Sequence, residues 1–152
     1  QYIPGFADAF VDGTATTLGI RTSRYLAGDY QMTEADLRAG SRHADCVGRF
    51  VGYDNVRKHA GPNAWASQIC HDDSSDLPRR ALLPAGLDGL VMGAGRSISI
   101  ANPSALRVMV HTMVVGQGAG TIAAVAAATG QTPRSVDIAA VQAELRRNGV
   151  LM

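Results

Sequence analysis

A stretch rich in glycine and alanine, VVGQGAGTIAAVAAATG at residues 114–130, constrains the fold of this chain most. Its glycines lie inside a helical pattern, whereas a phosphate-binding loop needs them between a strand and a helix start. Each glycine inside a helix costs about 1 kcal/mol relative to alanine, so three of them need a packing reason. Small residues recur at helical spacing along one stripe: Gly116, Gly120, Ala123 and Ala127. We predict that this stripe lets a strand, a helix or a flat ligand approach the backbone closely.

The residues before this stretch predict a strand followed by the start of the same helix. GLVMGAG, at residues 89–95, is a short apolar run closed by glycines, which is typical of a buried strand entering a tight turn. In NPSALRVM, Asn102 suits the N-cap and Pro103 suits the first helical position. The helix that begins there should run to Gly130, a residue type expected just after a helix end.

A last helix is predicted in TPRSVDIAAVQAELRRNG, near the end of the sequence. Ile138, Val141 and Leu145 fall on one face of it, which favours packing of that face against the rest of the fold. Arg146 and Arg147 lie in its last turn, where positive charge interacts favourably with the helix dipole.

The first half of the chain carries weaker signals. LGIRTSRYL, at residues 18–26, has the β-branched and aromatic content of a strand. MTEADLRAG predicts a short helix that begins with a capping box of Thr33 and Asp36 and ends near Gly40. The signals for helices and strands are weak over residues 41–80, where HAGPNAW and HDDSSDLP are interpreted as turns or exposed loops.

Composition limits the classes of function. Hydrophobic residues make up 46% of the chain and charged residues 18%, which is typical of a globular protein. A net charge of +1 and only 5% aromatic residues argue against a nucleic-acid partner, and no polybasic run indicates a membrane surface. The most apolar stretch, residues 104–128, is interrupted by Arg107, His111 and Gln117, so we predict no membrane-spanning helix.

The cysteines and histidines give no clear reactive site. Cys46 and Cys70 could pair or stay free, and their spacing does not suit zinc. His111 lies inside the predicted long helix, where it could face a site but is more simply satisfied by packing. Three further histidines lie in loop-like regions and are expected at the solvated surface: His43, His59 and His71. HDD at residues 71–73 is too weak a pattern to predict a metal site.

Three separated segments carry a family resemblance when they are taken in order. They are GIRTSRYLAGDYQMTEADL, PRRALLPAGLDGLVMGAGRSIS and ALRVMVHTMVVGQGAGTIAAVAAATGQTPRSVDIAAVQAELRRNGVL. Together they resemble the C-terminal part of FAD-dependent oxidoreductases related to fumarate-reductase and glutathione-reductase-type flavoproteins. The resemblance implies an α/β fold: the C-terminal portion of a two-domain enzyme that completes a Rossmann-like FAD domain and is not an independent fold. Residues 1–80 would then belong to the substrate or cap domain, and residues 81–152 to the FAD-binding domain.

The resemblance also implies which residues meet the cofactor. It places three residues of LVMGAGR beside the ribityl chain or pyrophosphate of FAD: Gly93, Gly95 and Arg96. It places three further residues at the start of the helix that points at the flavin pyrimidine ring: Leu106, Arg107 and Val108. These would act mainly through backbone amides, because a helix start favours the negative charge of reduced flavin. The alternative for Arg107 is a structural ion pair.

Arg21 and Arg24 match two arginines of the family's GxRxxR stretch. In a regular strand, residues three apart point to opposite faces, so at most one would face the flavin or an acidic substrate. A guanidinium binds carboxylates in a bidentate manner, which makes a small anionic substrate conceivable.

The family's strand–GxGxxG–helix unit, which holds the ADP half of FAD, does not occur in these residues. The resemblance therefore implies a second polypeptide that bears this unit. Because the sequence starts at Gln1 without an initiator methionine, we expect either that a precursor was cut before Gln1 or that the expressed sequence was chosen to start there. The first hypothesis is a flavoenzyme subunit or fragment that acts on a small molecule. The alternative is a non-catalytic scaffold or regulatory module that kept this packing without binding flavin. The cellular compartment stays open.

Overall fold

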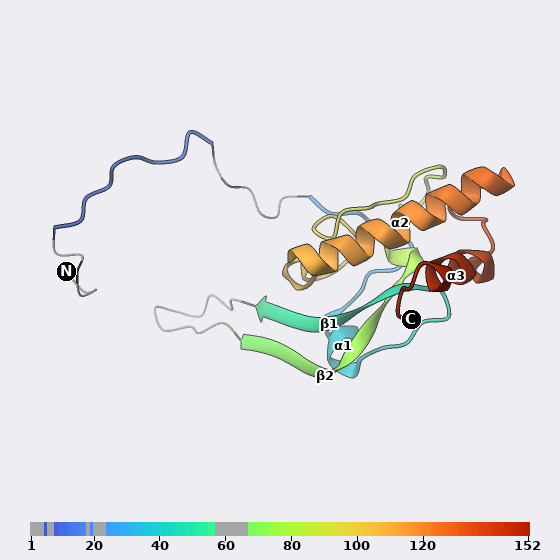
Figure 1. The fold of residues 1–152 in the computed structure, drawn as a ribbon, viewed down its shortest axis with the longest axis horizontal. Helices are drawn as coiled ribbons and strands as arrows, with labels where there is room; N and C mark the ends of the chain where they lie inside the picture. The colour runs from blue at the N-terminus through green and yellow to red at the C-terminus, as the bar shows by residue number, and fades with distance from the viewer. Residues whose placement is uncertain (1–4, 6–7, 18, 20–23, 57–66) are drawn as a thin grey trace.

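The computed structural model describes residues 5, 8–17, 19, 24–56 and 67–152 (Figure 1). A long helix lies across a two-stranded hairpin, and two shorter helices pack beside them. Residues 8–17 extend away from this body as exposed chain without helix or strand. The elements in chain order are α1 (Glu34–Ala39), β1 (Cys46–Val56), β2 (Ser67–Pro78), the 3₁₀ turn η1 (Arg79–Ala81), the 3₁₀ turn η2 (Pro103–Leu106), α2 (Met109–Thr129) and α3 (Ile138–Arg147).

Helix α1 confirms the predicted capping box. The Thr33 hydroxyl accepts a hydrogen bond from the backbone N–H of Asp36, and the Asp36 carboxylate accepts one from the Thr33 N–H at 2.7 Å. Burial by itself would raise the pKa of Asp36, but hydrogen bonds from Thr33 and Tyr30 outweigh it and hold that pKa below its ordinary value. Gly40 then ends the helix in the left-handed conformation that glycine adopts without strain.

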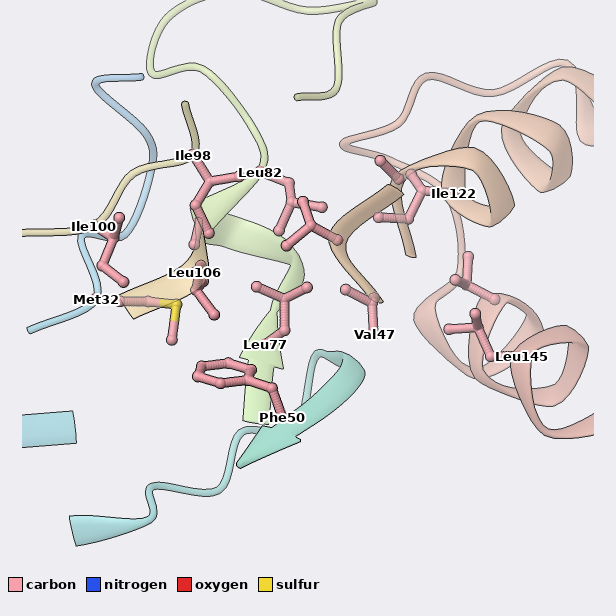
Figure 2. Close-up of a cluster of buried hydrophobic side chains, with 14 of the residues drawn as sticks. Met32, Val47, Phe50, Leu77, Leu82, Ile98, Ile100, Leu106, Ile122 and Leu145 are labelled. Carbon is pink, nitrogen blue, oxygen red and sulfur yellow. The ribbon is translucent and has the colours of Figure 1, made fainter. Parts of the chain in front are cut away.

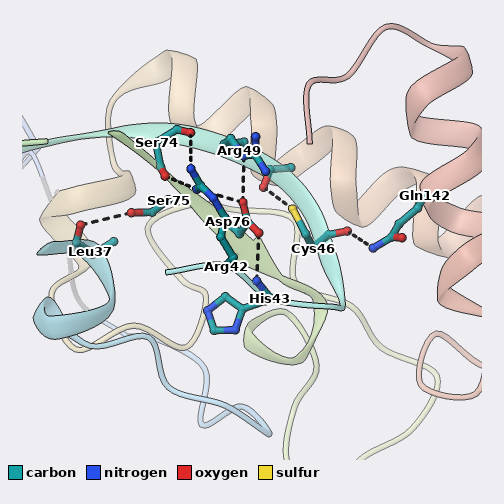
Figure 3. A network of polar contacts seen from close by, with 10 residues as sticks. Leu37, Arg42, His43, Cys46, Arg49, Ser74, Ser75, Asp76 and Gln142 are labelled. Carbon is teal, nitrogen blue, oxygen red and sulfur yellow. Dashed lines mark hydrogen bonds and ion pairs between the residues drawn. The ribbon is translucent and has the colours of Figure 1, made fainter. Parts of the chain in front are cut away.

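Strand β2 overturns the interpretation of HDDSSDLP, residues 71–78, as a turn or exposed loop, while HAGPNAW lies outside the described residues. Strands β1 and β2 form in this part of the chain instead. They pair antiparallel, with Cys46 opposite Pro78 and Val56 opposite Ser67. The prediction failed because β2 has a polar sequence, but some of its polar side chains are buried and hydrogen-bonded to other parts of the fold (Figure 3). Asp76 is buried, and its carboxylate accepts hydrogen bonds from Arg49 Nε at 2.9 Å and from the His43 backbone N–H at 3.0 Å. Paired in this way, a buried charge is tolerated, and a polar segment becomes a strand.

The two other predicted strands are not seen among the described residues. Residues 89–95 are irregular, with Gly89 at φ +78°, and are held by single contacts such as Met92 N–H to Leu82 O at 2.8 Å. Residues 24–26 of the predicted strand at 18–26 are also irregular, and most of its other residues lie outside the described chain. The described sheet is therefore a small antiparallel hairpin. A short apolar run forms a strand only where another strand offers hydrogen bonds, and none of the strands that the structure describes lies beside residues 89–95.

Helix α2 begins later than predicted and ends where predicted. Residues from Pro103 form only the short 3₁₀ turn η2, the chain then breaks, and α2 starts at Met109 with Val108 as its N-cap. At the other end, Gly130 takes the left-handed conformation, and its N–H donates to Ala127 O at 3.3 Å.

Helix α2 is the one helix of the described chain that is long and apolar enough to cross a membrane. A third (33%) of its most apolar window is buried inside this fold, where it packs on β1 and α3, and a single helix of this length and composition is weak evidence of a span. Its apolarity is therefore no clear sign of a membrane span.

The hydrophobic core lies between the hairpin, α2 and the segments that precede α2 (Figure 2). Leu77 and Phe50 from the hairpin meet Leu106 from η2 and Ile100 from the irregular segment before it. The core also contains the face of α3 that the sequence predicts, since Val141 and Leu145 are fully buried and Ile138 packs against them. Residues from both predicted domains thus contribute to one core, and the boundary at residue 80 stays a prediction.

The close helix contact falls on a different face of α2 from the predicted stripe. A Cβ atom added at Gly118 would lie 2.9 Å from the carbonyl oxygen of Val47, so α2 approaches β1 through this glycine. At Gly120 an added Cβ would meet nothing within 4 Å, and Ala123 and Ala127 are exposed. Of the predicted stripe, Gly116 does meet another segment, since an added Cβ there would lie 3.6 Å from the carbonyl oxygen of Gly93. The prediction for Gly120, Ala123 and Ala127 was wrong for the contacts within this chain, because helical spacing defines a stripe but not the side that the fold covers.

We expect opposite effects from the same substitution at these two glycines. Gly118→Ala should destabilise the fold by about 1–3 kcal/mol, because the new methyl group overpacks against the Val47 backbone. Gly120→Ala should stabilise it by up to about 1 kcal/mol, because helix propensity improves and the site is open. Urea unfolding of both variants measures the two effects, and a shift of the same sign in both would contradict the assigned faces of α2.

Arg134 ties the turn between α2 and α3 to the segment around residue 86. Its guanidinium donates to Pro84 O at 2.7 Å and to Asp88 Oδ1 at 2.7 Å, and it also pairs with Asp29. This side chain anchors the α2–α3 turn on the same irregular segment that leads to residues 89–95.

Candidate functional site

A pocket of about 380 Å³ opens at the start of α2, and it brings together two of the predicted site residues. Arg96 comes from the loop after residues 89–95, and Arg107 comes from the break between η2 and α2. The remaining lining residues are Met109, Thr112 and Met113, which lie on one side of the first turns of α2. Segments on either side of η2 thus meet at one helix start.

Gly95 is the residue that allows this meeting. It is buried, and a Cβ atom added to it would overlap the carbonyl oxygen of Leu106 and lie 3.1 Å from the Thr112 hydroxyl oxygen. That hydroxyl donates a hydrogen bond to the same Leu106 carbonyl at 3.2 Å. The loop therefore presses its backbone directly onto the start of α2, which requires a residue without a side chain.

The electrostatics of the pocket favour an anion. The N–H groups of Met109, Val110 and His111 occupy the first turn of α2, where they have no acceptor within the helix. Val108 offers no side-chain oxygen as a cap, and the first turn contains no acidic residue. The partial positive charge of a 21-residue helix is therefore not offset by its own side chains, and two guanidinium groups lie beside it.

The structure changes how the other predicted residues contribute. Leu106 is fully buried in the core, so its side chain cannot touch a ligand in the pocket. Because α2 begins at Met109, the helix-start amides lie one turn later than predicted from Leu106, Arg107 and Val108. Gly93 lies exposed in the loop.

The structure describes one of the two arginines that are proposed to bind substrate. Arg24 is exposed in an irregular segment, and Arg21 lies outside the described residues. Their relation to a strand, and to each other, therefore stays a prediction.

His111 is satisfied by packing, as the sequence favours. It is buried, its Nδ1 lies 2.9 Å from Ala105 O, and its ring contacts Phe50 with centroids 5.4 Å apart. Hydrogen-bonded in this way, His111 braces η2 against α2 from the core side of the pocket.

His43 departs from its expected place at the solvated surface. Its ring lies edge-on to Tyr30, with centroids 5.3 Å apart, and its Nε2 is buried. Burial, with a hydrogen bond to Asp36, raises the pKa of Tyr30 to about 12. His59 lies outside the described residues, and nothing is described of the side chain of His71. The cluster around Tyr30 is a packed polar contact of α1 with the hairpin.

Cys46 is a free thiol at the start of β1, so it is not paired with Cys70. Burial raises the pKa of Cys46, and its Sγ donates to Gly48 O at 3.1 Å. Among the described residues no group of three or more His, Cys, Asp or Glu side chains could hold a metal ion.

Sequence reasoning missed Met109, Thr112 and Met113 as pocket residues. Their spacing of three and four residues places them on one helix face, which was a usable signal. The spacing did not point to a site, because a helix that begins at Pro103 would place these residues beyond its first turn and away from its N-terminal N–H groups.

Comparison with known proteins assigns the chain to a family. A family profile described as FAD dependent oxidoreductase matches residues 1–145, which is nearly the whole chain. Comparisons with curated proteins and with solved structures gave no match. The mixed helices and small antiparallel sheet are consistent with a domain of such an enzyme. The cofactor of this family is FAD and its activity is that of an oxidoreductase. By this match over nearly its whole length, the chain belongs to the family of FAD-dependent oxidoreductases.

Proposed function

We propose that this chain supplies the flavin-ring end of an FAD site in a flavoprotein oxidoreductase, as a subunit or processed fragment. The observation that carries the proposal is the pocket in which Arg96 and Arg107 lie beside the first turn of α2. Positive groups of this kind fit a cofactor that carries phosphates and a ring able to hold negative charge. When bound, FAD would supply two-electron transfer and gain negative charge on its pyrimidine ring on reduction.

The start of α2 would stabilise that negative charge. The N–H groups of Met109, Val110 and His111 are donors of its first turn that have no acceptor within the helix. Arg107 stands in the break just before the helix and lines the pocket, so it adds a full positive charge to the partial charge of the helix. Fixed donors that favour the charged form of a bound group raise its tendency to accept electrons.

The loop at residues 93–97 would hold the ribityl chain or pyrophosphate. Arg96 lines the pocket, and a guanidinium binds phosphate oxygens in a bidentate manner. Gly95 keeps the loop against the Leu106 carbonyl and so holds Arg96 at the pocket. Gly93 is exposed and has no side chain, which leaves the backbone there open to a ligand.

For the substrate we propose a small anionic molecule recognised by Arg24 or Arg21. Arg24 is exposed, so its guanidinium is accessible to a carboxylate. The support is the match of both arginines to the family's GxRxxR stretch.

A second polypeptide would bring the GxGxxG unit for the ADP half of FAD. The face of α2 away from the core supports such a partner, because Gly120, Ala123 and Ala127 lie exposed on it at helical spacing. An apolar helix face of this kind usually marks an interface. The small-residue stripe would then serve contact between chains.

The test is Arg107→Ala in the complete flavoprotein assembly. Charge-assisted hydrogen bonds contribute about 1.5–3 kcal/mol, so we expect flavin affinity to fall about 10- to 100-fold, with a lower flavin reduction potential. Flavin content by visible absorbance and potentiometric titration measure both effects.

Arg146→Ala is the matched control, because it removes the same charge from an exposed position in the last turn of α3. It should leave flavin content and potential at wild-type values. An Arg107→Ala assembly with wild-type reduction potential and flavin content would contradict the proposed role of Arg107 in binding the flavin. An assembly that purifies colourless, without flavin, would favour the scaffold alternative.

A further inference from the structure

Two methionines at the mouth of the pocket are unusually open to solvent. Met109 is 79% exposed and Met113 is 69% exposed, and the two lie one helical turn apart. Both line the pocket that also contains Arg96 and Arg107. By contrast, Met32 is fully buried in the core, so one chain contains methionines at both extremes of exposure.

We propose that Met109 and Met113 form a paired oxidation site that lowers flavin retention when it is modified. The oxidant is hydrogen peroxide. A bound reduced flavin would supply it by passing two electrons to dioxygen, which takes up two protons, so the proposal rests on the proposed function. In each event a sulfur lone pair attacks one peroxide oxygen, the S–O bond forms and the O–O bond breaks. The sulfur loses two electrons as a sulfoxide, and the second oxygen leaves as water with both protons.

The geometry gives this oxidation a consequence for the pocket. A thioether is apolar, whereas a sulfoxide is polar and its oxygen accepts hydrogen bonds. Arg96 and Arg107 are donors that line the same pocket, so a sulfoxide on Met109 or Met113 competes for them with an anionic ligand. Oxidation therefore replaces an apolar thioether in the pocket with a sulfoxide oxygen that accepts hydrogen bonds from the arginines. Binding of the flavin weakens although the arginines themselves are unchanged.

The first experiment maps the oxidation in the purified protein. The protein is treated with hydrogen peroxide for set times, quenched and digested with trypsin, and mass spectrometry detects each sulfoxide as an added mass of about 16 Da. Peptide 108–134 carries Met109 and Met113, peptide 25–38 carries Met32, and peptide 81–96 carries Met92. We expect peptide 108–134 to take up one and then two oxygens about tenfold faster than peptide 25–38. Equal rates for these two peptides would overturn the site.

The second experiment measures flavin retention and distinguishes the two proposals. Wild type and the double variant M109L/M113L are each compared with their own untreated sample after the same peroxide exposure. We expect the treated wild type to retain several-fold less flavin than its untreated sample, and the double variant to show no such fall. Equal falls in both proteins, or none in the wild type, would overturn the regulatory role. If neither protein binds flavin before treatment, the proposed function fails and with it the regulatory role, while the peptide map still decides the oxidation site.

Discussion

Gly95→Ala should destabilise the fold by about 3 kcal/mol, at the upper end of the range for overpacking. The added methyl group would overlap the Leu106 carbonyl oxygen and stand 3.3 Å from Thr112 Cα. Both are backbone atoms, so no flexible side chain can move aside. Either the loop lifts away from the start of α2 or η2 shifts, and each movement separates Arg96 from Arg107. Urea unfolding measures the loss of stability, and flavin content measures the loss of the pocket.

Gly93→Ala is the matched control in the same loop. An added Cβ at Gly93 would lie 3.6 Å from the Ala119 Cβ, which is an ordinary contact. We expect a change within about 0.5 kcal/mol, as for other substitutions without a clash. Equal stability of the Gly95 and Gly93 variants would contradict the close approach of the loop to α2.

Leu106→Ala should destabilise the fold by about 2–5 kcal/mol, which is the range for truncating a buried leucine. Leu106 is fully buried, where η2 meets the hairpin (Figure 2). Its carbonyl accepts from Thr112 and lies against Gly95, so the cavity would loosen the pocket from the core side. Thermal and urea unfolding give the stability, and flavin content again gives the state of the pocket.

Leu106→Met separates packing from chemistry at this position. The substitution conserves volume and leaves the backbone in place, so it should cost less than about 1.5 kcal/mol and retain the flavin. Leu151→Ala, at a position 82% exposed, should change stability by less than about 0.5 kcal/mol. A Leu106→Ala protein as stable as Leu151→Ala would refute the place of Leu106 in the core.

Local signals predicted the ends of elements well. Thr33 and Asp36 form a capping box from two side chains three residues apart, which needs no tertiary contact. Gly130 ends α2 for a similar reason, because glycine takes the left-handed conformation without a Cβ penalty. The start of α2 was misjudged from Pro103, since proline suits a 3₁₀ turn as well as a first helical turn.

The hairpin was invisible in the sequence because its stabilising contacts are distant. Asp76 lies in a polar run that is typical of a loop, yet Arg49 of β1 and Arg42 from the segment before β1 pair with its carboxylate (Figure 3). Gln142 of α3 adds hydrogen bonds to Ala44 O at 2.9 Å and Cys46 O at 3.0 Å. Whether such a segment forms a strand therefore depends on contacts with residues that are distant in the sequence and come together only in the folded chain.

The sequence by itself determined the local elements and, through its resemblance to a family, the cofactor and the candidate residues. Helical spacing also defined the glycine and alanine stripe, but spacing cannot tell which face of a helix meets the core. Only the tertiary structure decided that Gly118, and not Gly120, approaches β1. It likewise decided that Arg96 and Arg107 line one pocket, because Gly95 lets the loop rest on the Leu106 carbonyl at the start of α2. The physical reason is the same in both cases: close approach depends on which backbone lies opposite, and that is a property of the folded chain.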